Sequence, residues 1–191
     1  MPEASHCKHF VRKLYPWEIQ EAQRVFGSSL DYARVRISEC TPLTNTLHRF
    51  GLWLRRQKAE PAPNAITLGN HCYFPIRLPE ARLEPQDPEH YKISWLIHEL
   101  THAWQYQHMG WKYLYLALHI QWKEKGRAYD YGHAEGLKRR QREGWKLSQF
   151  NLEQQGDICR GFYDRLCRGQ DTQPWQPYIQ QVQEKVLRKR I

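Results

Sequence analysis

Apolar side chains recur three or four residues apart in several stretches of this chain, which is the spacing of an amphipathic helix. Candidate N-caps, prolines and glycines at the ends of these stretches set the limits of each one. The pattern predicts helices over residues 16–26, 88–108, 114–123, 148 or 151 to 167, and 175–186. The basic segment 134–146 is compatible with a further helix, although its apolar stripe is narrow.

Two regions show the alternation of a β-strand rather than the spacing of a helix. Apolar and basic residues alternate over 32–37, which predicts a half-buried strand. Two β-prone runs, 65–68 and 71–74, are joined by Gly69 and Asn70, which accept positive φ and so predict a tight hairpin. We therefore expect an α+β fold, mostly helical, with a small β-sheet or hairpin beside the longest helix.

The composition is that of a folded chain. Of the 191 residues, 40% are hydrophobic and 13% aromatic, including 8 tryptophans, which excludes a disordered protein. The length favours one principal domain over 14–170, preceded by a tail over 1–13 and followed over 171–191 by an amphipathic helix that packs on it or extends from it. No run of about 20 apolar residues predicts a transmembrane helix. The N-terminus lacks the features of a secretory signal peptide, so we expect synthesis in the cytoplasm.

Charge and cysteine content narrow the classes of function. The net charge of +9 admits a nucleic-acid partner or an anionic cell-envelope surface. The densest basic runs, 138–142 and 185–190, are not interleaved with aromatic residues, so we expect solvated faces and rank nucleic-acid binding last. The five cysteines include no C-x-x-C pair, which argues against a cysteine zinc knuckle or a disulfide framework. We expect buried or incidental thiols.

An H-E-x-x-H motif, His98-Glu99-Leu100-Thr101-His102, lies inside the longest predicted helix. Two histidines four residues apart lie about one turn apart on one helix face, so both imidazoles reach the same metal ion. Glu99 between them is placed to act as a general base toward an attacking water molecule. The alternative is a pair of structural histidines on a core helix, and a third ligand decides between the two.

A catalytic zinc site uses three protein ligands, so the third has to come from elsewhere in the chain. His108 follows His102, but Gln105 stands where a glycine would break the helix, so a continued helix carries His108 about 9 Å further along its axis. Glu153 and Asp157 are better candidates, because residues four apart share one face of a helix. Glu153 would be the third ligand, and Asp157 would accept a hydrogen bond from the second ring nitrogen of a ligand histidine. Gln105 itself either lines the site or is solvated.

Together these residues resemble a known family. The H-E-L-T-H motif followed by E-Q-Q-G-D resembles the gluzincin arrangement, in which E-x-x-x-D supplies the third ligand and its supporting aspartate. The wider pattern, from about Leu14 to Tyr163, includes PWEI, VFG, VRI, HELTHAWQ, YDY and NLEQQ. It looks like the zinc-metallopeptidase domains found as VgrG-related proteins and as C-terminal extensions of type VI secretion spikes.

The resemblance implies a zincin-like fold and a zinc metallopeptidase that hydrolyses peptide bonds. The implied Zn²⁺ ligands are His98, His102 and Glu153, with Glu99 as catalytic base and Asp157 as the aspartate that orients a ligand histidine. Three residues that precede the third-ligand helix are candidates for stabilising the oxyanion: Tyr129, Tyr131 and His133.

The resemblance also implies a biological setting. An antibacterial effector carried on a secretion spike would act on a protein or peptide substrate, such as one of the cell envelope, in the periplasm of a rival cell. Delivery of this kind needs no signal peptide. The alternative is a non-catalytic adaptor or binding module of the spike, in which the metal site is structural and Glu99 is dispensable.

Overall fold

The computed structural model describes residues 7–41, 64–110 and 131–185 of the chain. Within these ranges the chain forms an α+β structure in which helices predominate over a small mixed sheet of four short strands. This finding confirms the predicted α+β class. The predicted helix over 114–123 lies outside the described residues.

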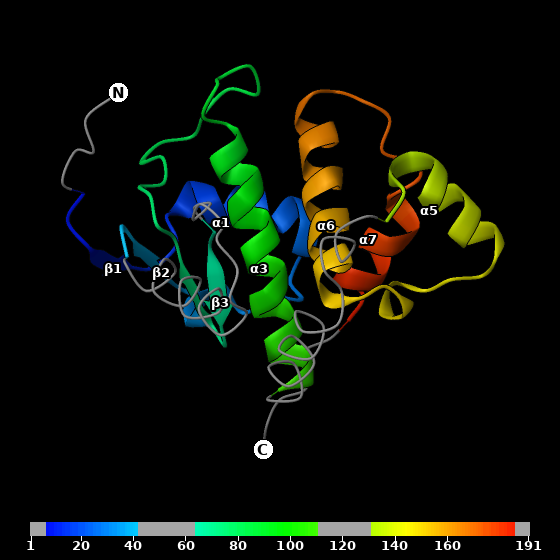
Figure 1. Cartoon of the computed structure of the whole chain (residues 1–191), viewed down its shortest axis with the longest axis horizontal. Coiled ribbons are helices and arrows are strands. Elements are labelled where there is room, and N and C mark those ends of the chain that lie inside the picture. The colour runs from blue at the N-terminus through cyan, green and yellow to red at the C-terminus, as the bar shows by residue number, and fades with distance from the viewer. Residues whose placement is uncertain (1–6, 42–63, 111–130, 186–191) are drawn as a thin grey trace, which may run out of the picture.

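The four strands form one sheet in the order β1-β2-β4-β3 (Figure 1). They are β1 (Phe10–Arg12), β2 (Arg36–Glu39), β3 (Ile66–Leu68) and β4 (His71–Tyr73). β2 runs antiparallel to β1 and parallel to β4, while β3 and β4 form the predicted hairpin with Thr67 opposite Cys72. Gly69 in the connecting turn has a φ of 66°, which a side chain would disfavour. Because β3 is the last strand in this order, it is an edge strand of the described sheet.

The predicted strand over 32–37 is wrong in its first half, where Tyr32–Arg34 form a short 3-10 helix, η1. The backbone turns there beside Asp31, whose amide donates to Gln107 Oε1 at 2.8 Å and whose carbonyl oxygen accepts from Gln107 Nε2 at 3.1 Å. Such a contact with a distant helix leaves no trace in the local alternation. The second half of the segment belongs to β2, where Ile37 is buried as predicted.

Five helices accompany the sheet in the described part of the chain. They are α1 (Pro16–Phe26), α3 (Tyr91–Met109), α5 (His133–Arg142), α6 (Leu152–Cys167) and α7 (Gln176–Gln183), with a second 3-10 helix, η2 (Leu147–Gln149). All five coincide with predicted helical segments. α3 begins later than predicted, because Asp87 accepts a hydrogen bond from the Glu89 amide at 2.7 Å within a turn, and the first helical residue is Tyr91.

The first turn of α6 is fixed by the cap that the sequence predicts. Asn151 Oδ1 accepts a hydrogen bond from the Gln154 amide at 2.8 Å, and Gln154 Oε1 accepts one from the Asn151 amide at 3.2 Å. Two backbone donors at the helix start are thereby satisfied. The other predicted cap, Ser148, lies in η2. The capped turn carries Glu153, so its position is well defined.

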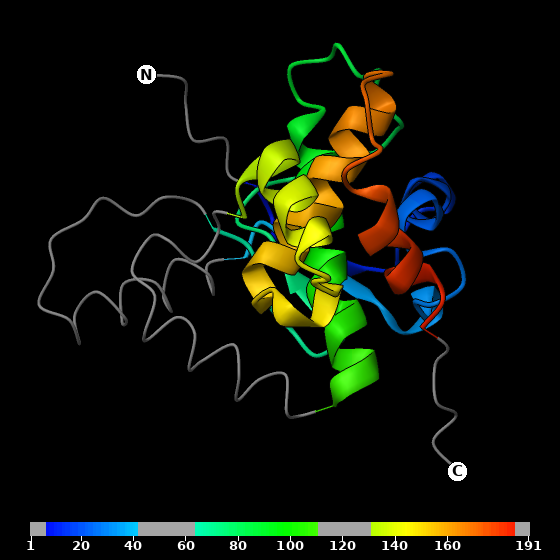
Figure 2. The same cartoon turned by 90° about the vertical axis from the view of Figure 1, so that its right-hand side faces the viewer.

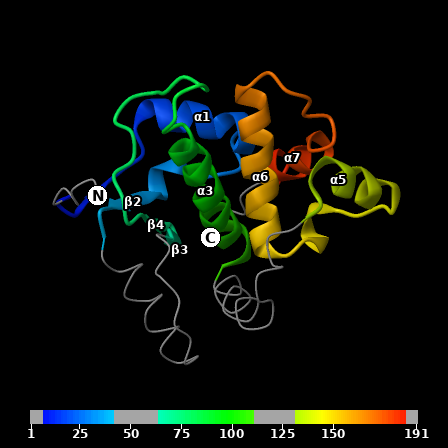
Figure 3. The same cartoon turned by 45° about the horizontal axis from the view of Figure 1, so that its top comes forward.

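α3 is the centre of the fold. It lies between the sheet on one side and α6 on the other (Figure 1, Figure 3). α7 packs against α1 and α6, and Figure 2 shows α5 and α7 in front when the molecule is seen from the side opposite the sheet. Apolar side chains from these layers, among them Phe26, Phe74, Leu100 and Ile179, form the core. The part of α3 that carries the H-E-x-x-H motif is therefore covered by the sheet on one side and by α6 on the other.

Two cysteines differ from the expectation of free thiols. Cys7, next to β1, forms a disulfide with Cys40, next to β2, while Cys72 and Cys159 are free and buried as expected. The spacing of cysteines along a chain does not reveal their pairing, because pairing depends on how the strands meet. β1 itself lies within the segment that we predicted to be a tail, and it pairs with β2 of the sheet.

None of the described helices has the length and apolar character needed to cross a membrane.

Candidate metal centre

The H-E-x-x-H motif lies in the buried middle of α3. His98 and His102 are 5% exposed, and Glu99 is 4% exposed. A polar group buried without a partner costs about 1–3 kcal/mol, so each of these side chains needs a partner in the interior. The partners come from α6 on one side and from the sheet on the other.

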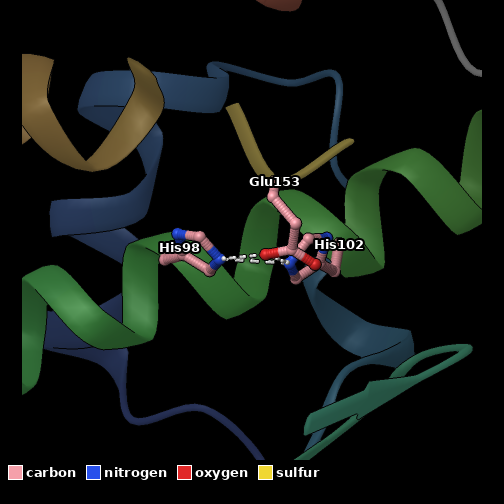
Figure 4. Close-up of side chains that lie close together, drawn as sticks. All are labelled: His98, His102 and Glu153. Carbon is pink, nitrogen blue, oxygen red and sulfur yellow. Dashed lines mark hydrogen bonds and ion pairs between the residues drawn. The ribbon is translucent and has the colours of Figure 1, made fainter. Parts of the chain in front are cut away.

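α6 brings Glu153 to the two histidines (Figure 4). Glu153 Oε2 lies 3.3 Å from His98 Nε2 and 3.5 Å from His102 Nε2, and the two nitrogens are 3.1 Å apart. In the described part of the chain, this is the group of side chains whose ligand atoms converge closely enough to hold a metal ion. Two segments that are far apart in the sequence thus meet at one point.

The outer nitrogen of each histidine faces an acceptor. His98 Nδ1 is 3.1 Å from Asp157 Oδ1, and an ionised carboxylate can only accept, so Nδ1 carries the proton. His102 Nδ1 is 2.9 Å from Gln105 Oε1, a carbonyl oxygen that likewise only accepts. In the neutral form both rings therefore turn the lone pair of Nε2 toward Glu153.

The charge balance of the site also favours a cation. Burial lowers the pKa of His98, but hydrogen bonds to Asp157 and Glu153 and the charge of Glu99 outweigh it and raise the pKa to about 10. The pKa of His102 is raised in the same way, against the effect of burial, by its hydrogen bond to Glu153. Burial alone would raise the pKa of Glu153, yet the two histidines hold it far below its usual range. A divalent cation would supply the positive charge that this arrangement otherwise draws from protons.

Glu99 has its partner in the sheet rather than in α6. Thr67 Oγ1 of β3 donates a hydrogen bond to Glu99 Oε2 at 2.7 Å, and Thr67 is itself buried. The thiol of Cys72 on β4 contacts the backbone oxygen of Glu99 at 3.8 Å. The candidate general base is thus held by the edge strand of the sheet. Sequence reasoning placed residues 65–68 in a strand but gave no sign that Thr67 contacts the motif.

Gly156 explains how closely α6 approaches α3. A Cβ atom at this position would lie 2.7 Å from His98 Cε1 and 2.9 Å from His98 Nδ1, closer than ordinary van der Waals contact. A residue without a side chain therefore lets the His98 ring sit between Glu153 and Asp157. Sequence reasoning missed this role. The available signal was a glycine inside a capped helix, where it costs about 1 kcal/mol relative to alanine.

For Gln105 the sequence left two roles open, lining the site or solvation at the surface. Gln105 is fully buried rather than solvated, and its side chain links His102 to the start of α6 through Leu152 and Gln155. A glutamine one turn after the second histidine is visible in the sequence. What the sequence did not show is that α6 supplies partners for it.

Of the two tyrosines proposed as oxyanion donors, the structure describes only Tyr131, which is not among the side chains that converge with Glu153. Tyr129 lies outside the described residues. The Tyr131 hydroxyl accepts a hydrogen bond from Trp175 Nε1 at 3.3 Å and lies against Gly161. Gly161 is eight residues after Glu153 on α6, which is about 12 Å along the helix axis.

Two further histidines, His108 and His133, are not among the side chains that converge with Glu153. His133 begins α5, where its ring contacts that of Tyr131 with centroids 5.3 Å apart. His108 Nε2 lies 2.9 Å from the Ser29 carbonyl oxygen near the end of α3. The structure thus agrees with the expectation that a continuous helix carries His108 away from the motif.

Comparison with known proteins relates the chain to type VI secretion. Over 157 residues, which are 80% of its length, the chain is 31% identical to the type VI secretion system spike protein VgrG2b of Pseudomonas aeruginosa. The chain spans only 13% of the length of that protein. No protein-family model matches the chain, and no solved structure matches it. The similarity supports a link to type VI secretion, while the zincin-like fold stays a prediction.

Proposed function

We propose that this chain is a zinc-dependent metallopeptidase in which His98, His102 and Glu153 hold the metal ion. The proposal rests on one observation: two imidazole nitrogens and a carboxylate oxygen from two helices converge closely enough to hold one metal ion. Two histidines and one glutamate are a known ligand set of catalytic zinc in peptidases, and they leave one position open. Structural zinc sites use four protein ligands instead.

The separations of the ligand atoms fit zinc. Tetrahedral bonds of about 2.0–2.1 Å place neighbouring ligand atoms about 3.3–3.4 Å apart. The three observed separations are 3.1, 3.3 and 3.5 Å, on either side of that value. Imidazole nitrogens suit zinc, whereas calcium and magnesium prefer oxygen ligands. The residues present therefore fit a zinc ion.

The protein's own groups supply the remaining chemistry. When bound, zinc would act as a Lewis acid toward the scissile carbonyl and the attacking water. Glu99 would take a proton from that water and pass it to the leaving amine. Thr67 holds one oxygen of this carboxylate and ties the base to β3. An extended peptide that pairs with the edge of β3 would therefore run beside Glu99.

The proposal includes the fold type and the biological setting. A helix with both histidines, an edge strand that holds the base and a second helix with the third ligand support a zincin-like fold. The similarity to a spike protein supports association with a secretion spike and delivery by a type VI system. We propose that the substrate is a protein or peptide of the cell envelope, and that the chain acts as an antibacterial effector in the target-cell periplasm.

A peptide-cleavage assay tests the enzymatic part of the proposal. The zinc-loaded protein is incubated with a proteome-derived peptide library, and new termini are counted by mass spectrometry for the wild type and for Glu99→Gln. We expect cleavage by the wild type, its loss with a chelator, its return with zinc, and a loss of about 10²- to 10⁴-fold in Glu99→Gln. Glu99→Gln should keep one zinc per chain, because Glu99 is not a ligand.

The alternative is a non-catalytic adaptor of the spike, and the similarity to a spike protein is the observation that favours it. A protein that binds zinc but cleaves neither the library nor isolated cell-envelope protein would support the adaptor and contradict the peptidase. A growth assay separates the two in cells. Periplasm-directed wild type should arrest a susceptible bacterium, while periplasm-directed Glu99→Gln and the cytoplasmic wild type should not.

A further inference from the structure

Gln105 connects a candidate metal ligand to the helix that carries another. Its Oε1 faces His102 Nδ1 at 2.9 Å. Its Nε2 donates to the Leu152 carbonyl oxygen at 3.0 Å and to Gln155 Oε1 at 3.0 Å. Gln105 is fully buried, so these contacts are made away from bulk water.

Backbone carbonyl groups determine which way this amide points. A carbonyl oxygen cannot donate, so the end of Gln105 that faces Leu152 must be the NH₂ group. Gln155 is fixed in the same manner, because its own Nε2 donates to the Phe150 carbonyl oxygen at 2.8 Å. Its Oε1 is then left to accept from Gln105. The end of Gln105 that faces His102 is consequently the carbonyl oxygen.

The orientation of Gln105 in turn fixes the tautomer of His102. An acceptor at Nδ1 requires the proton on that nitrogen, so the lone pair lies on Nε2, the atom that faces Glu153. A neutral histidine in water divides its proton between the two nitrogens. Gln105 removes that choice and holds the ring plane in place.

We propose that Gln105 is a positioning residue that sets the metal affinity of the site by holding His102 as the Nδ1–H tautomer. The inference rests on the metal site proposed above and adds a residue that acts through a ligand. The Nδ1 atom of His98 donates to the carboxylate of Asp157, whereas that of His102 donates to the neutral amide of Gln105. The Leu152 carbonyl oxygen, in the first turn of α6, orients that amide. Glu153 lies in that same turn, so one small region positions two of the three ligands.

The test compares three variants of the full chain. Gln105→Leu removes the acceptor for His102, while Gln105→Glu keeps an acceptor but loses the donor to Leu152. Gln107→Leu is the matched control, because Gln107 also lies on α3 but its amide bonds to Asp31 and Asn70 rather than to a ligand histidine. Both leucine variants lose amide hydrogen bonds, which are buried at Gln105 and part-buried at Gln107, and they differ in the contact with His102.

The readouts are the Zn²⁺ dissociation constant, from competition with a fluorescent chelator, and the visible spectrum of the Co²⁺-loaded protein. Gln105→Leu should bind Zn²⁺ about 10- to 100-fold more weakly and alter the Co²⁺ spectrum. Gln107→Leu should stay within about threefold of the wild type, and Gln105→Glu, which keeps an acceptor but loses the donor that orients it, should fall between the wild type and Gln105→Leu. Circular dichroism of the metal-free proteins checks that each variant is folded.

The outcomes separate this inference from the proposed function. If the wild type binds neither ion, the metal site fails and the inference fails with it. If the wild type binds zinc and Gln105→Leu binds it equally well, the site stands and the role of Gln105 is refuted. Equal weakening in Gln105→Leu and Gln107→Leu would show a general structural effect and also refute it.

Discussion

Replacing Gly156 with alanine adds one methyl group against the ring of a proposed metal ligand. The new Cβ would lie 2.7 Å from His98 Cε1, 2.9 Å from Nδ1 and 3.0 Å from Nε2. All three atoms belong to a rigid ring in the core, so the ring has to move as a whole. The hydrogen bond of 3.1 Å to Asp157 and the convergence with Glu153 both depend on the present ring position.

The size of the displacement follows from these distances. To restore an ordinary contact of 3.4 Å, the ring or the helix must retreat by about 0.7 Å. Overpacking of this kind costs about 1–3 kcal/mol, whereas alanine gains up to about 1 kcal/mol over glycine in a helix interior. We therefore expect a modest net change in stability, but at least a tenfold loss of zinc affinity because a ligand is misplaced.

The assay measures the zinc dissociation constant and the urea midpoint of the metal-free protein for Gly156→Ala and for a control, Gly161→Ala. Gly161 lies on the same helix, and a Cβ there would meet Tyr131 Oη at 2.7 Å, away from the three ligands. The control should show a similarly modest change in stability and keep its zinc affinity. Unchanged zinc affinity in Gly156→Ala, or equal weakening in both variants, would refute the reasoning.

Three further predictions concern other parts of the structure. Thr67→Val removes a hydroxyl that donates to the Glu99 carboxylate, so urea unfolding should show a loss of about 1.5–3 kcal/mol with zinc content unchanged; an unaltered midpoint would contradict the contact. In metal-free protein the pKa of His98 is about 10 against 6.5 unfolded, so its protonated form stabilises the fold below pH 6.5 and this contribution is lost as pH rises through 10. In the presence of a chelator, the melting temperature should therefore fall as pH rises from 6.5 to 10, and bound zinc should remove this pH dependence. A melting temperature that does not change with pH in chelator would argue against a charged His98. Reduction, or Cys40→Ser, should cost about 2–4 kcal/mol, because the disulfide with Cys7 closes a sequence separation of 33 residues, and an unchanged melting temperature under reductant would contradict this.

The motif helix and the third-ligand helix were predictable because their signals are local. Helical spacing, the Asn151 cap and the i, i+4 placement of His98 and His102 depend on residues within one or two turns. The choice of Glu153 over His108 also followed from helix geometry, and the structure brings Glu153 to the histidines. Tertiary contacts are not needed to make either prediction.

The residues whose roles sequence reasoning missed or left open make their contacts across elements. Gln105 has a role because α6 presents a carbonyl oxygen to it, Gly156 because His98 needs its space, and Thr67 because β3 lies against α3. The first half of the strand predicted over 32–37 failed for the same reason, since a side chain of α3 holds the preceding turn. Periodicity describes one element at a time and cannot show what a second element supplies.

The central claim is that three side chains from two helices bind one zinc ion. A crystal structure of the zinc-loaded protein, with anomalous data collected on both sides of the zinc absorption edge, tests it most directly. We predict one anomalous peak per chain, about 2.0–2.2 Å from His98 Nε2, His102 Nε2 and a Glu153 oxygen, with the fourth position free of protein ligands. The absence of a peak there, a peak at other side chains, or a fourth protein ligand would contradict the account.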